Sequence, residues 1–261
     1  MALPLGAFPG NGPGRAAGRA GGELRRCGSG PGARCLPAPG APLPCGSPHL
    51  SGRAGGGMMS LRADLKLIAG MVPEGARVLD LGCGDGALLA WLTEHRGVRG
   101  YGIEIDEGQI TRCIARGVSV LERDIDEGLA DFPTDGFDVV VMAETLQAVR
   151  KPGAVLEQML RIAPRSIVTF PNFGHWRCRL ELATAGRMPM ARHLPHAWHD
   201  TPNIHLCTFA DFEALCDARR LTIYDRKVVN AQYQDAWYMN RWPNLFGTIA
   251  VYGLRRPGAA P

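Results

Sequence analysis

The feature that most constrains the fold of this chain is a short apolar run followed by three alternating glycines. The run Val78–Leu81 is apolar except for Asp80, which is typical of a buried parallel strand. The sequence continues Gly82-Cys83-Gly84-Asp85-Gly86. Because glycine has no Cβ, this segment can turn sharply and approach a ligand closely. Good helix formers follow at 87–94, so the sequence predicts a nucleotide-type pocket at the carboxyl end of a parallel sheet.

A second predicted strand indicates which nucleotide this pocket accepts. The strand covers 98–106, and its Glu104 follows Asp80 by 24 residues. An acid near that spacing binds ribose hydroxyls, and a carboxylate disfavours a 2′-phosphate. The glycines do not follow the dinucleotide fingerprint G-x-G-x-x-G, because Ala87 stands where its third glycine would fall. The pattern of strand, Asp80, glycine turn and Glu104 resembles the first motif of class I S-adenosylmethionine (SAM) methyltransferases.

The rest of the chain alternates strands and helices. The other predicted elements are helices at 61–71, 106–116, 152–162 and 208–219, and strands at 118–122, 137–142, 166–170, 221–229 and 246–254. This order predicts a doubly wound, mostly parallel α/β sheet. The last two strands have no crossover helix between them, so they predict a terminal antiparallel hairpin.

One segment, 171–207, breaks this alternation. It is polar, aromatic and punctuated by proline, and we expect it to form a lid over the carboxyl edge of the sheet. The residues expected to cover that edge are His175, Trp176, His193, Trp198 and His205. Such a lid would also suit a protein partner, because aromatic residues and arginine are enriched at interfaces.

Composition divides the chain near residue 57. Residues 1–57 hold 16 Gly, 9 Pro, six Arg and one acid, so we expect a disordered extension. We also expect native translation to begin at Met58 or Met59, with the folded domain covering 58–261. Residues 58–261 hold 23 Lys and Arg against 24 Asp and Glu. The mildly basic charge therefore comes from the extension and does not indicate nucleic-acid binding.

The sequence carries no signal for a membrane span, a secretory leader or a metal site. No apolar run has the length of a span, and no CxxC pair occurs among the eight cysteines. Free thiols favour a reducing compartment, so we expect a cytoplasmic protein. Pro195 interrupts the helix that would align the nearby histidines, so we predict no metal site.

Each candidate ligand residue has a second interpretation. Asp80 can accept from the amino group of a methionine moiety, directly or through water, or cap its own loop. Glu104 can hold the ribose or be a solvated strand end. Asp124 can accept from an adenine amino group or belong to an acidic surface run. Ile105 and Ile125 can enclose the adenine or belong to the core. The predicted cofactor-binding residues are Asp80, Gly82, Cys83, Gly84, Gly86, Glu104, Ile105, Asp124 and Ile125.

Glu144 is the one candidate for a catalytic role. It follows the fourth predicted strand, where the methyl acceptor of a methyltransferase would lie. A general base there would help if the acceptor must lose a proton. The alternative is that Glu144 caps a short helix.

Motifs outside the nucleotide pocket resemble the MetW family of methionine biosynthesis, over residues 61–254. The matching motifs are Val78–Gly86, Thr145–Ala148, Phe170–Trp176, Gly186–Pro189, Trp198–Cys207 and Asn240–Phe246. Most of them lie outside the general SAM-binding motifs, so they separate MetW from other methyltransferase-like proteins. Residues 1–57 have no counterpart in the family pattern.

The resemblance implies a Rossmann-like class I methyltransferase fold, SAM or S-adenosylhomocysteine as ligand, and a role in methionine synthesis. It also implies association with homoserine O-acetyltransferase, which MetW supports or activates. Three functions stay open. The chain can be a non-catalytic partner of the acetyltransferase, since no acceptor-site base is evident. It can be an active small-molecule methyltransferase, since the glycine loop is intact. It can also be a sensor in which SAM tunes the partnership.

Overall fold

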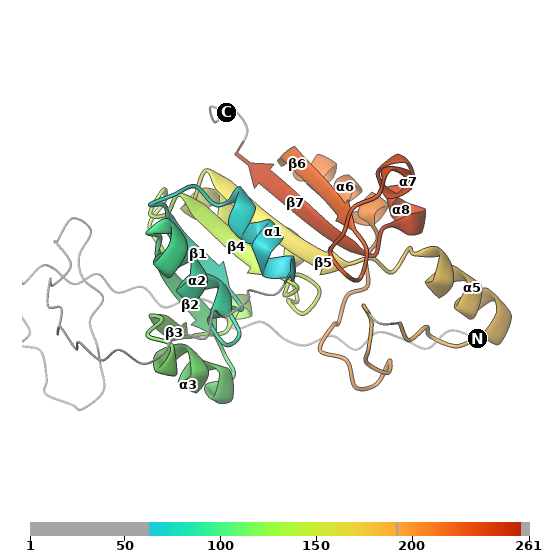
Figure 1. The fold of residues 1–261 in the computed structure, drawn as a ribbon, viewed down its shortest axis with the longest axis horizontal. Helices are drawn as coiled ribbons and strands as arrows, with labels where there is room; N and C mark the ends of the chain where they lie inside the picture. Colours follow the sequence, from blue (N-terminus) through green and yellow to red (C-terminus); the bar gives the residue numbers. More distant parts are fainter. Residues whose placement is uncertain (1–62, 192, 257–261) are drawn as a thin grey trace, which may run out of the picture. The chain divides into compact units, whose positions relative to one another are not determined.

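The computed structural model describes residues 63–191 and 193–256, which form a seven-stranded sheet with helices packed on it (Figure 1). The strands are β1 Arg77–Leu81, β2 Arg99–Glu104, β3 Val120–Glu122, β4 Val139–Ala143, β5 Arg165–Pro171, β6 Thr222–Val229 and β7 Ile249–Arg255. The helices are α1 Ala63–Met71, α2 Ala87–Arg96, α3 Glu107–Ala115, α4 Pro152–Ile162, α5 Trp176–Ala185, α6 Phe209–Ala218, α7 Trp237–Arg241 and α8 Pro243–Phe246, with a 3₁₀ turn η1 at Ile125–Glu127. The predicted extension 1–57 lies outside the described residues.

The strand order confirms the predicted topology. The sheet runs β3-β2-β1-β4-β5-β7-β6, and β1 to β5 are parallel. Strand β7 lies antiparallel between β5 and β6, which gives the predicted terminal hairpin. The carboxyl ends of β1 to β4 therefore meet at one edge of the sheet, where a doubly wound fold binds its ligand.

Alternation along the strands divides the apolar side chains between two cores. Leu79 and Leu81 of β1 join the core that contains α4 and α6, whereas Val78 joins the core that contains α1 and α2. Successive strand residues point to opposite faces, so a sheet covered on both faces needs apolar residues at nearly every position. Asp80 is the exception in β1: it is the one polar residue among the four buried positions of this strand.

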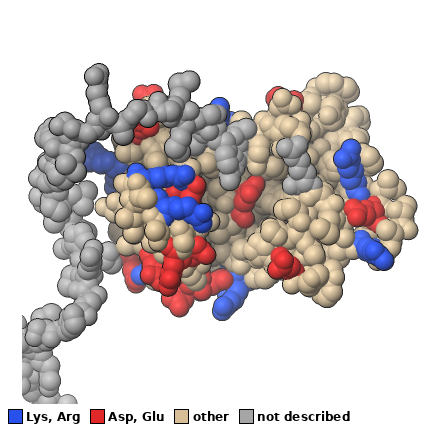
Figure 2. Space-filling model, turned by 60° about the horizontal axis from the view of Figure 1, so that its bottom comes forward, with Lys and Arg blue, Asp and Glu red and all other residues tan. Residues whose placement is uncertain are grey.

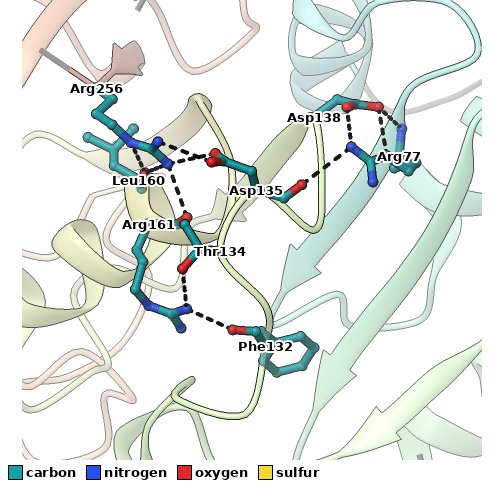
Figure 3. A network of polar contacts seen from close by, with 8 residues as sticks. All are labelled: Arg77, Phe132, Thr134, Asp135, Asp138, Leu160, Arg161 and Arg256. Atoms are coloured by element: carbon teal, nitrogen blue, oxygen red, sulfur yellow. Dashed lines mark hydrogen bonds and ion pairs between the residues drawn. The ribbon is translucent and has the colours of Figure 1, made fainter. Parts of the chain in front are cut away.

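A polar network fastens the opposite, amino edge of the sheet (Figure 3). Arg256, just after β7, pairs with Asp135 at 2.8 Å and donates to the carbonyl of Leu160. Arg77 of β1 pairs with Asp138 at 2.8 Å. This ion pair lowers the pKa of Asp138. Because the network lies away from the glycine loop, it fixes the ends of the strands and takes no part in the candidate site.

The helices after β5 show what periodicity missed. Helix α5 lies inside the segment 171–207, where the sequence predicted no helix, and α7 and α8 were also not predicted. Helices α7 and α8 have only five and four residues, too few to show a helical period. In α5 the apolar residues Trp176, Cys178, Leu180 and Leu182 stand at every second position, which is not the spacing of a helix face. Helix α6 was predicted, and a capping box between Thr208 and Asp211 fixes its start. Among residues 63–191 and 193–256, no helix combines the length and apolar character that crossing a bilayer requires.

Candidate functional site

The loop after β1 is the centre of the candidate site. It turns at Gly82 and Gly84 with φ of 73° and 54°, which glycine adopts without strain. A Cβ at Gly82 would collide with the side chain of Thr145, which follows β4. At Gly84, by contrast, no described atom beyond its two chain neighbours lies within 4 Å of where a Cβ would stand. The loop is therefore packed against the protein at Gly82 and open at Gly84.

Asp80 lies at the base of this loop as a buried acid. It is 2% exposed, and within the described part of the chain its Oδ1 has no hydrogen-bond partner. The amides of Gly82 and Cys83 donate to the carbonyl of Ile103 and not to Asp80. Burial raises the pKa of Asp80 to about 7, and the charge of Glu104 adds to the rise. Because an unpaired buried acceptor is costly, Asp80 is suited to a ligand that brings a donor or a positive charge.

Glu104 ends β2 and faces the glycine loop. Its Oε2 accepts from the amide of Gly84 at 2.8 Å. Its Oε1 accepts from the amides of Ile105 and Asp106 at 2.9 and 3.1 Å. A carboxylate has about four lone-pair sites, so these three bonds leave room for a ligand hydroxyl. The carboxylate is half-buried beside the glycine loop, and its assignment to the ribose stays a prediction.

The thiols of Cys83 and Cys113 contact each other beneath the glycine loop, and Cys113 also contacts the loop backbone. The Sγ atoms of Cys83 and Cys113 are 3.8 Å apart, and Cys113 Sγ also donates to the carbonyl of Gly84 at 3.1 Å. Burial raises the pKa of both thiols, which therefore stay neutral. The sequence analysis included Cys83 among the site residues but missed Cys113. Nothing in the spacing shows that a cysteine on α3 would reach the loop.

Of the three predicted adenine contacts, Asp124 and Ile125 have local roles in the structure, whereas Ile105 is exposed. Asp124 follows Arg123, whose amide donates to the carbonyl of Glu104 at 3.0 Å. The Asp124 Oδ1 accepts from the amide of Asp126 at 2.8 Å and so caps η1. Ile125 is 8% exposed and joins a core, whereas Ile105 is 61% exposed. Their assignment to the adenine stays a prediction.

Glu144 lies at the same edge, on the β4 side of the loop. Its φ is 57°, which is uncommon for a residue with a side chain. The hydroxyl of Tyr233 donates to Glu144 Oε1 at 3.2 Å, and Tyr233 also has a positive φ, 61°. Sequence reasoning missed Tyr233, because 89 residues separate the two. Glu144 precedes Thr145, the residue packed on Gly82, so this pair lies close to the glycine loop.

Three of the residues predicted to form a lid, His175, Trp176 and His193, lie against one another, and the lid itself stays a prediction. His175 is buried and caps the start of α5, and its ring lies 5.6 Å from that of His193. Burial lowers the pKa of His193 to about 4 and also lowers that of His175, so both rings are neutral near pH 7. Trp198 is 74% exposed. His205 lies nearer the site, since its amide donates to the carbonyl of Gln147 after β4.

The described residues hold no cluster of three or more His, Cys, Asp or Glu side chains arranged as metal ligands. The polar groups at the carboxyl edge are instead a buried acid, a half-buried acid and an open backbone turn. This set can bind a ligand that combines a cationic group with vicinal hydroxyls.

Comparison with known proteins identifies the family. The chain matches "Methionine biosynthesis protein MetW" over residues 62–254. A curated relative from Rhodopirellula baltica, "Bifunctional methionine biosynthesis protein MetXA/MetW", is 33% identical over 210 residues, which cover 76% of this chain and 33% of that protein. The ubiquinone biosynthesis O-methyltransferase of Methylococcus capsulatus is 32% identical over 132 residues, which cover 48% of this chain and 55% of that enzyme. The chain thus spans a third to just over half of the length of these relatives.

A solved structure shows the same fold. The S-adenosylmethionine dependent methyltransferase from Mesorhizobium loti superposes with a TM-score of 0.56 at 19% identity, over 74% of this chain and 98% of that chain. With the strand order above, this likeness confirms the predicted class I methyltransferase fold. The family match covers the motifs that carried the resemblance, including Phe170–Trp176 and Trp198–Cys207. This chain therefore belongs to the MetW family of methionine biosynthesis proteins.

Proposed function

We propose that this chain binds SAM or S-adenosylhomocysteine at the carboxyl edge of its sheet and supports homoserine O-acetyltransferase as a partner protein. One observation carries the ligand assignment: the unpaired Oδ1 of Asp80 is buried at the base of a glycine loop that is open at Gly84. In a folded protein such an acceptor normally has a partner, and a ligand ammonium group would supply one.

The residues of the edge fit the ligand group by group. Asp80 would hold the amino group of the methionine moiety, and Glu104 would accept from the ribose hydroxyls. Gly84 leaves room for the middle of the ligand to approach its Cα, since the space that a Cβ would take there is open. Asp124, Ile105 and Ile125 would contact the adenine. When bound, SAM supplies an electrophilic methyl group on a sulfonium ion.

The partner assignment has a different support. In the Rhodopirellula baltica relative, MetXA and MetW share one polypeptide, and the region similar to this chain is 33% of it. Covalent linkage keeps two modules at a high effective concentration, which benefits modules that act together. We therefore assign to this chain the supporting role that the MetW resemblance implies for homoserine O-acetyltransferase.

Two measurements on purified proteins test this proposal. Calorimetric titration of the full chain with S-adenosylhomocysteine should give one site per chain. The rate of homoserine O-acetyltransferase from the same organism should rise when the full chain is added. A rate that changes further with SAM would make the ligand a regulator of the partnership. Absence of ligand binding would contradict the first half of the proposal, and an unchanged acetyltransferase rate without co-purification would contradict the second.

A second candidate function is methyl transfer to a small molecule, and the Glu144–Tyr233 pair favours it. Two residues with strained backbone meet at the acceptor side of the loop, and such strain clusters at functional sites. Glu144 could take a proton from an acceptor, although holding the two substrates in line supplies much of the rate in such a reaction. Methyl transfer from labelled SAM to cell-extract metabolites, reduced at least tenfold by Glu144→Gln, would support it. Lack of transfer in any extract would reject it.

A further inference from the structure

Helix α5 projects from the sheet (Figure 1), and most of its side chains are exposed. In the described part of the chain, only Cys178 of its ten residues is buried. Trp176 and Leu180, one turn apart, are 39% and 53% exposed. A helix this short is marginal in water, and protein helices owe most of their stability to packing of an apolar face. The exposed apolar residues of α5 are therefore available to pack against another molecule.

Helices α7 and α8 extend this exposed surface. The carbonyl of Asn244 in α8 accepts from the guanidinium of Arg179 in α5 at 3.3 Å, so the two helices are neighbours. Trp237 is 76% exposed and Trp242 is 47% exposed. We name this region the tryptophan surface; it consists of Trp176, Leu180, Trp237, Tyr238 and Trp242. Its α7 and α8 part is one aromatic group, joined through Phe246, and the Arg179–Asn244 bond links this group to α5. Large exposed apolar residues on neighbouring helices mark interaction sites in water-exposed proteins.

The chemistry of the tryptophan surface is that of a protein interface. Arg177 lies over the ring of Trp176 and Arg241 over that of Trp242, each 5.3 Å from the ring centroid. Tryptophan, tyrosine and arginine are the residues that most often carry binding energy between proteins. On the face drawn in Figure 2, charged side chains are most numerous at the end opposite α5, and the end where α5 lies carries a smaller group of both signs. Exposed tryptophans paired with arginines therefore suit a protein partner.

We infer that the tryptophan surface is the docking site for homoserine O-acetyltransferase, an inference that rests on the proposed function. The fused relative from Rhodopirellula baltica gives the reason for this occupant. In that protein the two modules are joined covalently, whereas two separate chains need a non-covalent interface to stay together. Self-association fits less well. In a two-fold dimer each patch faces its own copy, which would bring Arg177, Arg179 and Arg241 toward like charges.

The tryptophan surface lies at the same edge of the sheet as the candidate ligand site. Helix α5 follows the carboxyl end of β5, and α8 precedes β7 at the same edge. This is the edge that carries the glycine loop and Glu104. A docked acetyltransferase would thus lie on the ligand-binding side of the sheet and not on the edge with the Arg256 network.

The test compares single substitutions in the full chain. Leu180→Glu and Trp242→Glu place a charge in the surface, and Ile114→Glu is the matched control because Ile114 is 66% exposed on α3, away from α5. Binding to the purified acetyltransferase is measured by calorimetry or surface plasmon resonance. We expect each surface variant to weaken the affinity at least tenfold and the control to leave it unchanged. All three variants should bind S-adenosylhomocysteine like the unaltered chain, which shows that they fold.

Three outcomes would overturn the inference, and they can be told apart. If both surface variants bind the acetyltransferase as tightly as the unaltered chain, the docking site lies elsewhere and the proposed function stands. If the unaltered chain does not bind the acetyltransferase at all, the partner assignment fails with the surface. If the chain forms dimers that Leu180→Glu abolishes, the occupant is a second copy.

Discussion

Asp80→Asn should weaken ligand binding and stabilise the ligand-free protein at the same time. The pKa of Asp80 is about 7 in the folded chain, against an ordinary value of 3.8. The folded state therefore holds this proton more tightly than the unfolded state, so stability falls as the pH rises from about 4 to 7. Each pKa unit corresponds to about 1.4 kcal/mol, so at pH 8 the substitution should raise the free energy of unfolding by about 1–4 kcal/mol. Urea denaturation at pH 5 and pH 8 measures this gain.

The same substitution removes the negative charge that would hold the ligand amino group. We expect Asp80→Asn to weaken S-adenosylhomocysteine binding at pH 8 by about tenfold or more, the usual worth of a charge-assisted bond. In the unaltered chain the affinity should fall about tenfold between pH 8 and pH 6, because Asp80 becomes protonated as the pH passes below its pKa. Asp80→Asn should abolish this pH dependence. Calorimetric titrations at the two pH values measure both effects.

Asp138→Asn is a control, because it should change the pH dependence of stability in the opposite direction from Asp80→Asn. Its partner Arg77 lowers the pKa of Asp138, so the ionised form stabilises the fold and the stability it contributes is lost as the pH falls. The pair is exposed, so removing it should cost less than about 1 kcal/mol and leave ligand affinity unchanged. If Asp80→Asn behaved like Asp138→Asn, Asp80 would be an ordinary structural acid and the ligand assignment would lose its support.

Glu104→Ala should produce the largest loss of ligand affinity. The carboxylate both holds the amide of Gly84 and faces the position expected for the ribose hydroxyls. A hydrogen bond to a charged group contributes about 1.5–3 kcal/mol, so the loss of the ligand bond that Glu104 has room for should weaken binding by about 10- to 100-fold. Calorimetry with S-adenosylhomocysteine measures the loss, and a thermal melt shows that the variant folds.

The matched control is Glu122→Ala. Glu122 lies opposite Glu104 in the register of the neighbouring strand β3, and it is an exposed glutamate at a strand end. Its removal should change ligand affinity less than twofold. Equal affinity of Glu104→Ala and the unaltered chain would show that Glu104 is the solvated strand end that the sequence also allowed.

Local sequence patterns predicted the elements whose conformation depends on residues near them in the chain. The apolar strands, the glycine turn and the capped helix α6 each depend on neighbouring residues, and their bounds agree to within a few residues. The edge that unites Asp80, Glu104 and Glu144 follows from parallel strands alone. The family was evident because its motifs are contiguous in the chain.

Contacts between distant residues could not be predicted in this way. The Glu144–Tyr233 bond and the thiol pair of Cys83 and Cys113 join segments that only the fold brings together. Helix α5 was missed for another reason. Its apolar residues alternate with polar ones from Trp176 to Leu182, so its sequence lacks the spacing of three or four positions that identifies a helix face.

A crystal structure of the full chain with S-adenosylhomocysteine tests the central claim most directly. The account predicts the ligand amino group within hydrogen-bond distance of Asp80, the ribose hydroxyls on Glu104 and the backbone of Gly84 against the middle of the ligand. A ligand bound elsewhere, or bound at this edge with Asp80 still unpartnered, would contradict it.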